Sequence, residues 1–520
     1  MKDHAPYPHV KQKSNPFGTA SVVTTLSVAE RALGFLYRIV LSRLIGAEGL
    51  GLYQVALSLF SVFLTIGTGG IPITVSRLIS KSKAENNPKG ERAATSAGFV
   101  LSLILTLPVA VLLGLFAQHL PFLFSDDRAV PVFKVLLLGL VFSSLYAVVR
   151  GSFWGNKQLV LPSVLEIAEE TVMVIVGVFL LQNVQSAADG ALSAGWAATI
   201  SYLFSFTAAI ICFLVSGKKL ASPKHTVKPL FQAALPITSV RAGGSLVNSA
   251  VAVLLPAMLI RAGASEAEAV GLFGIVSGMA TPVLFIPATI IGAISLVLVP
   301  ELSEDFYAKR FERLYKNIRR GLSAAFLIAC AIMPFFYVLG DSVGKIAFSE
   351  PLAGEFIRNG CPLLLPMSLT MISTGMLNSM GFEKQTFLYY FLSAAAMLLC
   401  ILLLPALCGA YAYVIGLGIS YVVNAVCNLA LLAKKCPTLF KRTGQGRVHA
   451  LFKAFVLLLP LSLLGKFFFA LFSHVLGEIT CLLCTTLALA ILTTAAYLLF
   501  KIVSLPKREK KCKILLKNVK

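Results

Sequence analysis

The sequence is short of charged residues, and above all of acidic ones. Charged residues make up 13% of the 520 residues and hydrophobic residues 57%, and the mean hydropathy is +0.84. These values exclude an ordinary soluble globular protein. No cleavable signal peptide is visible, because the first sixteen residues are polar and the apolar stretch after them is too long and too polar for a signal-peptide core.

The patterns of catalytic and metal sites are missing as well. The six histidines are scattered without metal-ligand spacing, and no P-loop or other nucleotide-binding motif is present. Cys481-x-x-Cys484 has no second pair nearby, so the ten cysteines predict neither a disulfide framework nor a metal centre. We therefore expect no enzyme, no metal and no cofactor. Active transport by such a chain would draw on Na⁺, H⁺ or the membrane potential.

The chain contains instead a series of apolar stretches of about 20 residues, the length that crosses a bilayer as a helix. They predict an all-α polytopic membrane protein with about fourteen transmembrane helices. The predicted spans are residues 17–45, 50–78, 93–118, 129–152, 159–182, 190–216, 230–260, 269–300, 317–340, 358–380, 385–405, 409–433, 449–472 and 477–501.

Basic residues are distributed unevenly between the predicted loops. If the N-terminus is cytoplasmic, the inner loops carry 33 of the 45 Lys and Arg residues, whereas the outer loops carry only Arg128, Arg261 and Lys345. This positive-inside pattern predicts a multi-pass protein of the cell membrane with both termini in the cytoplasm. The net charge of +22 is therefore mainly topological. We expect contact with membrane lipids and none with nucleic acid.

Short motifs recur in the same order in the two halves of the chain. Arg31-Ala32-Leu33-Gly34 returns as Arg241-Ala242-Gly243-Gly244, and Gly51-Leu52-Tyr53 returns as Gly271-Leu272-Phe273. Both halves begin inside, which predicts parallel repeats related by an axis along the membrane normal, with substrate bound where the halves meet. The predicted parts are a cytoplasmic N-terminal tail (1–16), an N-lobe of spans 1–6 (17–216), a cytoplasmic linker (217–229), a C-lobe of spans 7–12 (230–433), spans 13–14 (449–501) and a basic cytoplasmic tail (502–520).

Three arginines lie where charge is expensive. Arg31 and Arg38 are seven residues apart on one face of the first span, and Arg241 has the position of Arg31 in the second half. A charge at mid-bilayer depth costs roughly 2.5–3.5 kcal/mol, so a span tolerates it only beside a partner or a water-filled cavity. Guanidinium donates in a planar fork that suits phosphate. The three predict a clamp for a diphosphate; the alternative is that Arg31 pairs with a carboxylate such as Glu170 and only locks helices together.

Carboxylates share these spans. Glu30 lies beside Arg31 in the first span, and Glu166 and Glu170 lie one turn apart in the fifth. They are candidates for proton or sodium sites, or for counter-ions of the arginines. The alternative is a hydrogen-bond network in the inner leaflet.

Glycine and proline mark two spans as bent. Gly69, Gly70 and Pro72 interrupt the second span, and Pro282 and Pro287 interrupt the eighth. Such residues are the usual causes of kinks in helices. All five are therefore hinge candidates.

A block of the first predicted span can be compared with known families. The run from Glu30 to Arg38 (ERALGFLYR), continued from Ser42 to Tyr53 (SRLIGAEGLGLY), resembles the opening of the stage V sporulation protein B family. Further matching segments are Gly70-Ile71-Pro72, Arg150-Gly151, Gly155-Asn156-Lys157-Gln158, Leu235-Pro236 and the run from Leu298 to Glu304. The resemblance covers about residues 17–435. That family belongs to the polysaccharide-exporter branch of the MOP flippase superfamily, with the MurJ-like lipid II flippases, the O-antigen flippases and the MATE transporters.

The resemblance implies a flippase for an undecaprenyl-pyrophosphate-linked saccharide, such as lipid II or another precursor of cell wall or polysaccharide, in growth or sporulation. Arg31 matches a cavity arginine of MurJ-like proteins, and Arg241 and Glu170 match positions typical of the sporulation-type group. Arg38 falls one residue beyond the second MurJ arginine, and the eighth span lacks the arginine that MurJ has there. We expect a monomer that meets the glycolipid, membrane lipids and proteins of cell-wall synthesis.

Other functions make different predictions. A MATE-like antiporter, coupled to a cation, would need carboxylates that outweigh the arginines of its cavity. A non-transporting scaffold for wall synthesis would tolerate neutral residues in place of the charges in its spans. A polytopic glycosyltransferase would need a large outer loop, and the longest one here, about residues 341–357, is too short.

Overall fold

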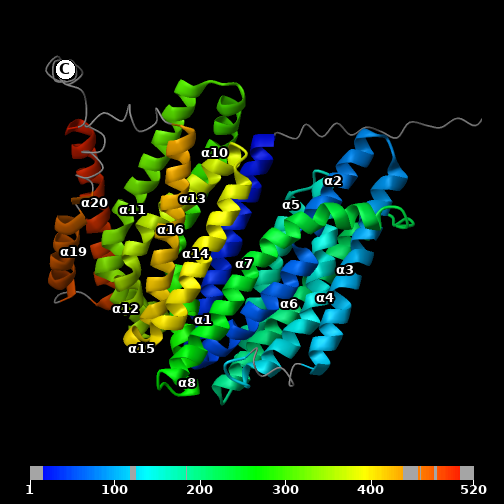
Figure 1. Cartoon of the computed structure of the whole chain (residues 1–520). Helices are drawn as coiled ribbons and strands as arrows, with labels where there is room; N and C mark the ends of the chain where they lie inside the picture. Colours follow the sequence, from blue (N-terminus) through cyan, green and yellow to red (C-terminus); the bar gives the residue numbers. More distant parts are fainter. Residues whose placement is uncertain are drawn as a thin grey trace, which may run out of the picture. The chain divides into compact units, whose positions relative to one another are not determined.

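The computed structural model describes residues 16–116, 124–182, 184–436, 455–456, 458–473 and 477–503. Within these ranges the chain forms helices joined by short turns, and no strand is present (Figure 1). The predicted tails, 1–16 and 502–520, lie almost entirely outside the described residues, as does the start of the thirteenth predicted span. The prediction of an all-α protein is confirmed.

The helices are apolar on the outside as well as the inside. Helix α3 (Pro88–Phe116) exposes Ile104, Val111 and Leu115, the last of them 63% exposed. A soluble monomer rarely exposes such a continuous apolar surface, whereas a lipid-facing helix does so along its whole length. Twelve helical segments among the described residues are long and apolar enough to cross a membrane. The protein is therefore a multi-pass membrane protein.

Twelve differs from the predicted fourteen because two predicted spans share one segment, one predicted span is divided and two are not counted. Predicted spans 1 and 2 both lie in Ser21–Ala84, where Gly46 (φ 68°, ψ −175°) is non-helical and separates two helices between the two predicted spans. Predicted span 8 forms two segments, Glu266–Leu284 and Ile286–Tyr307. The fifth predicted span is not among the twelve because it contains three glutamates. The thirteenth is not among them because its described apolar part, Pro460–Ser473, is short.

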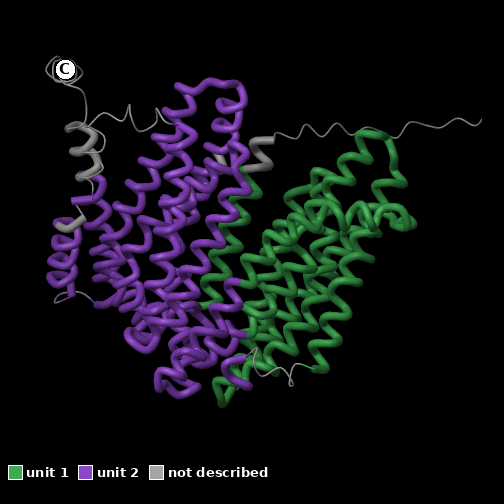
Figure 2. Tube along the Cα trace, viewed as in Figure 1, with its two compact units in different colours: residues 1–38, 56–121, 128–246 green, residues 39–55, 122–127, 247–520 purple. Residues whose placement is uncertain are grey.

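The chain divides into two compact units, drawn in green and purple in Figure 2. Unit 1 comprises residues 1–38, 56–121 and 128–246, and unit 2 comprises residues 39–55, 122–127 and 247–520. Helix α1 (Pro16–Thr68) and helix α7 (Val227–Arg261) each contribute to both. The predicted lobe boundary at residues 217–229 stays a prediction, and the contacts assign residues 227–246 of α7 to unit 1.

Unit 1 is built around helix α4 (Ala129–Gly155), which packs against α2, α3 and α6. The other complete helices of this unit are α2 (Ile71–Ala84), α3, α5 (Val160–Leu181) and α6 (Ala187–Val215). Small residues let the backbones approach, as is typical of membrane helices. A Cβ at Gly151 of α4 would lie 2.6 Å from the carbonyl oxygen of Pro72 in α2.

The helix break predicted in the second span is present. α1 ends at Thr68 and α2 begins at Ile71, so Gly69 and Gly70 form the bend and Pro72 lies in the first turn of α2. The bend is packed against α7: a Cβ at Gly70 would overlap the carbonyl oxygen of Ala234. That contact explains why glycine stands here. The hinge role of these residues stays a prediction.

Unit 2 contains the rest of the chain. Its helices are α8 (Glu266–Phe273), the π-helix η3 (Gly274–Ala280), α9 (Thr281–Leu284), α10 (Ile286–Tyr307), α11 (Phe311–Phe348), α12 (Pro351–Gly360), the short 3-10 helix η4 (Cys361–Leu363), α13 (Leu364–Ser379), α14 (Glu383–Leu403), α15 (Pro405–Cys408), α16 (Tyr411–Lys435), α19 (Leu458–Ser473) and α20 (Glu478–Val503). Pro282 and Pro287 lie in the first turns of α9 and α10. Both prolines therefore stand where the eighth predicted span is interrupted, as expected of bending points, and their hinge role stays a prediction.

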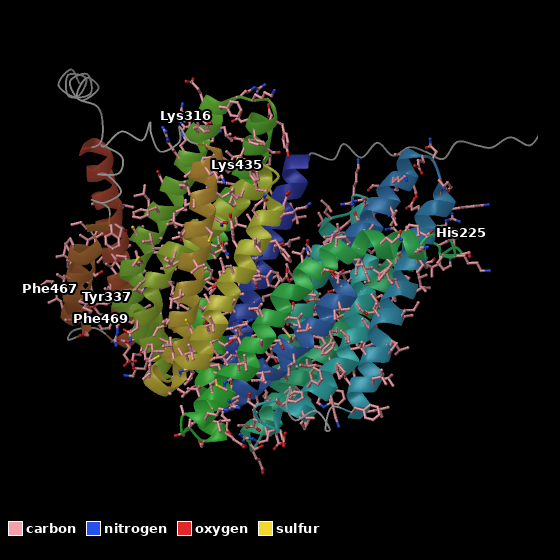
Figure 3. The ribbon with its side chains drawn as sticks, in the orientation of Figure 1. His225, Lys316, Tyr337, Lys435, Phe467 and Phe469 are labelled. Atoms are coloured by element: carbon pink, nitrogen blue, oxygen red, sulfur yellow. The ribbon has the colours of Figure 1, made fainter. Side chains whose placement is uncertain are left out.

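The last two helices of unit 2 pack on α11. Phe469 of α19 lies against Val338 and Leu339 of α11, next to Tyr337, whereas Phe467 is 63% exposed (Figure 3). The ammonium of Lys466 lies 4.4 Å from the ring centroid of Tyr337. The two helices thus form a layer added to one side of unit 2.

Segments that the sequence repeat relates to each other meet directly within unit 2. The helix containing Gly51 crosses the one containing Gly271 so closely that a Cβ at Gly51 would overlap the carbonyl oxygen of Val270. A Cβ at Gly274 would likewise overlap the carbonyl oxygen of Ala47. Equivalent segments come together in this way where a two-fold axis passes between them. The contact agrees with the parallel repeat inferred from the motifs.

Gly51→Ala should therefore lower the stability of the protein by about 1–3 kcal/mol, the usual cost of overpacking. Gly271→Ala is the matched control, because its Cβ would meet only the backbone of Glu48 at 3.8 Å, an ordinary contact. Alanine improves helix propensity equally at both positions. Thermal unfolding of the two variants in detergent, followed by size-exclusion chromatography, measures the difference. Equal midpoints would contradict the close crossing.

Candidate functional site

Charged residues of unit 1 gather where the first part of α1 meets α5. A Cβ at Gly34 of α1 would lie 3.6 Å from the nearer carboxylate oxygen of Glu170 on α5. The ring of Tyr37, also on α1, packs against Gly177 of α5. Glycine on one helix thus makes room for a carboxylate, and glycine on the other makes room for an aromatic ring. The two contacts hold these helices together over about one turn of α1 and two turns of α5.

An ion pair joins α4 to α5 beside this contact. A guanidinium nitrogen of Arg150 donates a hydrogen bond to Glu166 at 2.7 Å, and both side chains are largely buried, with exposed fractions of 26% and 20%. The guanidinium also lies 5.0 Å from the ring centroid of Trp154 and 5.7 Å from that of Tyr146. Partial burial and the aromatic contacts make this pair stronger than an exposed one.

Arg150 interacts electrostatically with more than one carboxylate. Its charge also acts on Glu30 of α1 and on Glu169, which shares a hydrogen bond with Ser205 of α6. The charge of Glu166 also acts on Glu30. Glu30, Arg150, Glu166, Glu169 and Glu170, together with Arg38, are here called the charge cluster. In this cluster, carboxylates and guanidinium groups of α1, α4 and α5 interact electrostatically with one another.

The three predicted clamp arginines belong to unit 1 and have different surroundings. Arg38 is half-buried and interacts electrostatically with Glu170. Arg31 and Arg241 are exposed, and neither forms a hydrogen bond or an ion pair with another described residue. The charge that acts on Glu170 is that of Arg38, whereas the charge of Arg31 acts on Glu30, its neighbour in α1. The pairing of Arg31 with a carboxylate therefore stays an alternative. Whether Arg31 and Arg241 face each other stays a prediction.

Arg43, the remaining arginine of the first span, has a structural role. It donates hydrogen bonds to the backbone carbonyls of Ile346 and Ala347, in the last turn of α11. These carbonyls have no partner within the helix, and a cation at a helix C-terminus satisfies them. All these residues lie within unit 2. Arg43 thus anchors a helix end.

Two atoms of the charge cluster have spare hydrogen-bonding capacity. The Nε of Arg150 and one carboxylate oxygen of Glu170 are buried without a hydrogen-bond partner among the described residues. A buried polar group left in this way is costly and is usually met by water, an ion or a ligand. No group of His, Cys, Asp and Glu able to hold a metal ion is found in the part of the chain that the structure describes.

Sequence reasoning missed Arg150 as a member of this site. It lies near the end of α4, and Glu166 lies near the start of α5, at nearly equal distances from the turn between the two helices. In an antiparallel helix pair, residues equidistant from the turn lie side by side. That spacing of opposite charges was the signal that could have identified the pair.

Comparison with known proteins agrees with the fold and with the resemblance. Stage V sporulation protein B of Bacillus subtilis is 25% identical over 366 residues, which cover 66% of this chain and 69% of that protein. Lipid II flippase MurJ of the same organism is 24% identical over 400 residues, 70% and 72% of the two chains. A structure of lipid II flippase MurJ in an inward closed conformation superposes with a TM-score of 0.71 at 16% identity, covering 92% of this chain and 98% of that one.

These relatives are a flippase and a sporulation protein, which agrees with the prediction that the chain is not an enzyme. The likeness to MurJ extends the two-lobe fold to this chain. Residues 19–306 match the family described as polysaccharide biosynthesis protein. Because that match spans more than half of the chain, the protein belongs to this family, among the members of the MOP flippase superfamily that are similar to stage V sporulation protein B.

Proposed function

We propose that the protein is a flippase that moves an undecaprenyl-pyrophosphate-linked saccharide across the cytoplasmic membrane by alternating access. Lipid II, or a related precursor of cell wall or polysaccharide, is the substrate. The observation that carries the proposal is the exposure of Arg31 and Arg241, which form no hydrogen bond or ion pair with another described residue although they lie on helices long and apolar enough to cross a membrane. The named activity of the related lipid II flippase supports the substrate class.

Exposed guanidinium groups on membrane helices have few explanations. Lipid cannot solvate them, so they must face water or a ligand of opposite charge. A diphosphate offers that charge together with oxygens that accept the parallel hydrogen bonds of a guanidinium fork. Arg31 and Arg241 therefore bind the diphosphate, and Arg38 joins them from its place beside Glu170.

The charge cluster supplies the driving step in this proposal. Glu170 interacts with Arg38 and Glu30, so a proton or Na⁺ bound at Glu170 would free Arg38 for the diphosphate. Movement of the anionic substrate outward is also favoured by a potential that is negative inside, since each elementary charge gains about 2.3 kcal/mol per 100 mV. We propose that both termini are cytoplasmic, as the distribution of basic residues predicts.

Complementation tests the function. The chain would be expressed in a bacterium depleted of its own lipid II flippases, and survival and externally accessible lipid II would both be scored. The expected result is rescue with normal exposure of lipid II. Absence of rescue by correctly inserted protein would contradict lipid II as the substrate.

A cation-coupled antiporter or a scaffold would give different results in this complementation assay. An antiporter should export cationic compounds without exposing lipid II. A scaffold should retain its effect when the arginines are neutralised. Accessible lipid II that depends on Arg31 would exclude both.

A further inference from the structure

A basic cavity lies at one end of unit 1, where α2, α3, α4 and α6 end or begin. Its volume is about 370 Å³, within the range of small-molecule sites. Four of its lining side chains are basic, namely Lys83, Arg92, Lys218 and Lys219. A single lining carboxylate, Glu91, opposes them. The cavity is distinct from the charge cluster and shares no residue with it.

The end of α6 places Lys218 in this cavity. Gly217 adopts a φ of 67°, which reverses the chain after the helix. Its amide donates to the carbonyl of Leu214 at 2.9 Å, and the amide of Lys218 donates to the carbonyl of Phe213 at 3.4 Å. This pair of hydrogen bonds is the Schellman motif, a defined end to a helix. The backbone of Lys218 is thus held by a local structure and not by a loose loop.

The linker that follows is tied to α3, and the side chain of Lys218 is turned inward. The amide of Ala221 donates to the hydroxyl of Ser96 at 3.1 Å. The ammonium of Lys218 lies 3.8 Å from the ring centroid of Phe153 on α4. It is buried and has no hydrogen-bond partner among the described residues. His225, labelled in Figure 3, marks the same linker a few residues further on.

A buried ammonium without a hydrogen bond is unfavourable. It has lost water around three donors, and the ring of Phe153 returns only part of that energy. Burial accordingly lowers the pKa of Lys218 to about 8, while Glu91 acts to raise it and Lys83 to lower it further. Lysines near helix ends often bond to the last carbonyls, but this one bonds to none. A negatively charged hydrogen-bond acceptor in the cavity would therefore stabilise the ammonium of Lys218.

We propose that this cavity binds a phosphate group, with the ammonium of Lys218 as its central donor. Lys83 from α2, Arg92 from α3 and Lys219 from the linker surround it with further positive charge. Phosphate suits the site because its oxygens accept hydrogen bonds from several directions at once. The phosphate belongs either to a soluble anion or to the headgroup of an anionic lipid, since the cavity lies at the ends of membrane helices. The site does not depend on the proposed transport.

Binding can be measured on the full-length protein in an uncharged detergent by isothermal titration calorimetry. One arm uses inorganic phosphate at constant ionic strength, and the other uses dioctanoyl phosphatidylglycerol, with the phosphatidylcholine analogue as its neutral control. Saturable binding of phosphate assigns a soluble anion, and binding of phosphatidylglycerol alone assigns a lipid headgroup. Either supports the proposal, and absence of binding in both arms would overturn it.

Lys218→Met is the decisive variant, because it keeps the apolar stem and removes the charge. Affinity should fall roughly tenfold or more. Lys224→Met is the matched control, since Lys224 is exposed on the same linker and does not line the cavity, and it should bind as the wild type does. Thermal stability of Lys218→Met should be equal or higher, because an unfavourable buried charge is gone. Equal affinity in Lys218→Met and wild type would overturn the assignment, and so would a large loss of stability with unchanged binding.

The pH dependence adds an independent readout. Lys218 in the empty cavity loses its proton as the pH rises through about 8. An anionic phosphate group prefers the protonated form of Lys218, so the affinity should fall as the pH rises above about 8. The other charged groups that face the same cavity are Glu91, Lys83, Arg92 and Lys219. The fall should disappear in Lys218→Met, and its persistence there would overturn the role of Lys218.

Discussion

Arg31→Ala and Arg241→Ala are each expected to reduce exposure of lipid II roughly 100-fold while the protein still inserts and folds. Removing one charged partner from a desolvated contact costs about 2–5 kcal/mol, and each 1.4 kcal/mol is a factor of ten. Stability should change little, since neither side chain bonds to another described residue. External accessibility of lipid II in flippase-depleted cells measures the effect, and protein in the membrane fraction normalises it.

Matched variants separate binding from general electrostatics. Arg261→Ala removes an exposed arginine from the last turn of the same helix, α7, and should keep transport within about twofold. Arg31→Lys keeps the charge but loses the planar fork, so its activity should be intermediate. Full activity of Arg31→Ala and Arg241→Ala would show that the diphosphate is bound elsewhere.

Arg150→Met should destabilise the protein by about 3 kcal/mol, and Glu166→Gln by about half as much. Removing one partner of a largely buried ion pair leaves the other without compensation. Arg150 also offsets the charges of Glu30 and Glu169, whereas Glu166 has a single hydrogen-bonded cation. The larger cost expected for Arg150→Met follows because Arg150 interacts with several carboxylates. Unfolding in detergent by heat or denaturant measures both variants.

The double variant completes this test. If the two residues act as a pair, Arg150→Met with Glu166→Gln should cost less than the two single changes together, with a coupling of about 1–2 kcal/mol. Lys345 and Glu478 form the control pair, because they lie 3.2 Å apart but are both about two-thirds exposed. Their coupling should stay below about 1 kcal/mol. Similar couplings for the two pairs would mean that burial adds nothing to the Arg150–Glu166 contact.

Much of the fold could be predicted because hydropathy and helix length are set by the bilayer. The helix boundaries α4 (Ala129–Gly155) and α16 (Tyr411–Lys435) differ from the predicted spans by a few residues. The eighth span was harder, because the π-helix η3 and two prolines interrupt a run that is apolar throughout. Hydropathy shows how apolar a segment is, but it does not show where the backbone hydrogen bonds change from the α-helical to the π-helical pattern.

The site was predictable in its residue types and less so in its contacts. Arginine and glutamate inside a span are visible in any sequence, so Arg31, Arg38 and Glu170 could be selected at once. Which charges meet depends on helix rotation and crossing, and Gly34 shows why: the absence of a side chain on α1 brings Glu170 next to it. The assignment of Arg241 to unit 1 likewise depends on packing of α7 against Gly70 and is not written in the local sequence.

The most direct test of the account is flipping by the purified protein. Proteoliposomes would contain an undecaprenyl-pyrophosphate-linked disaccharide peptide with a fluorescent headgroup, and a membrane-impermeant quencher would report the fraction on the outer leaflet over time. The account predicts exchange of the protected fraction with wild type and Arg261→Ala, and none above empty vesicles with Arg31→Ala. Exchange that is equal in wild type and Arg31→Ala, or absent in both with folded protein, would contradict it.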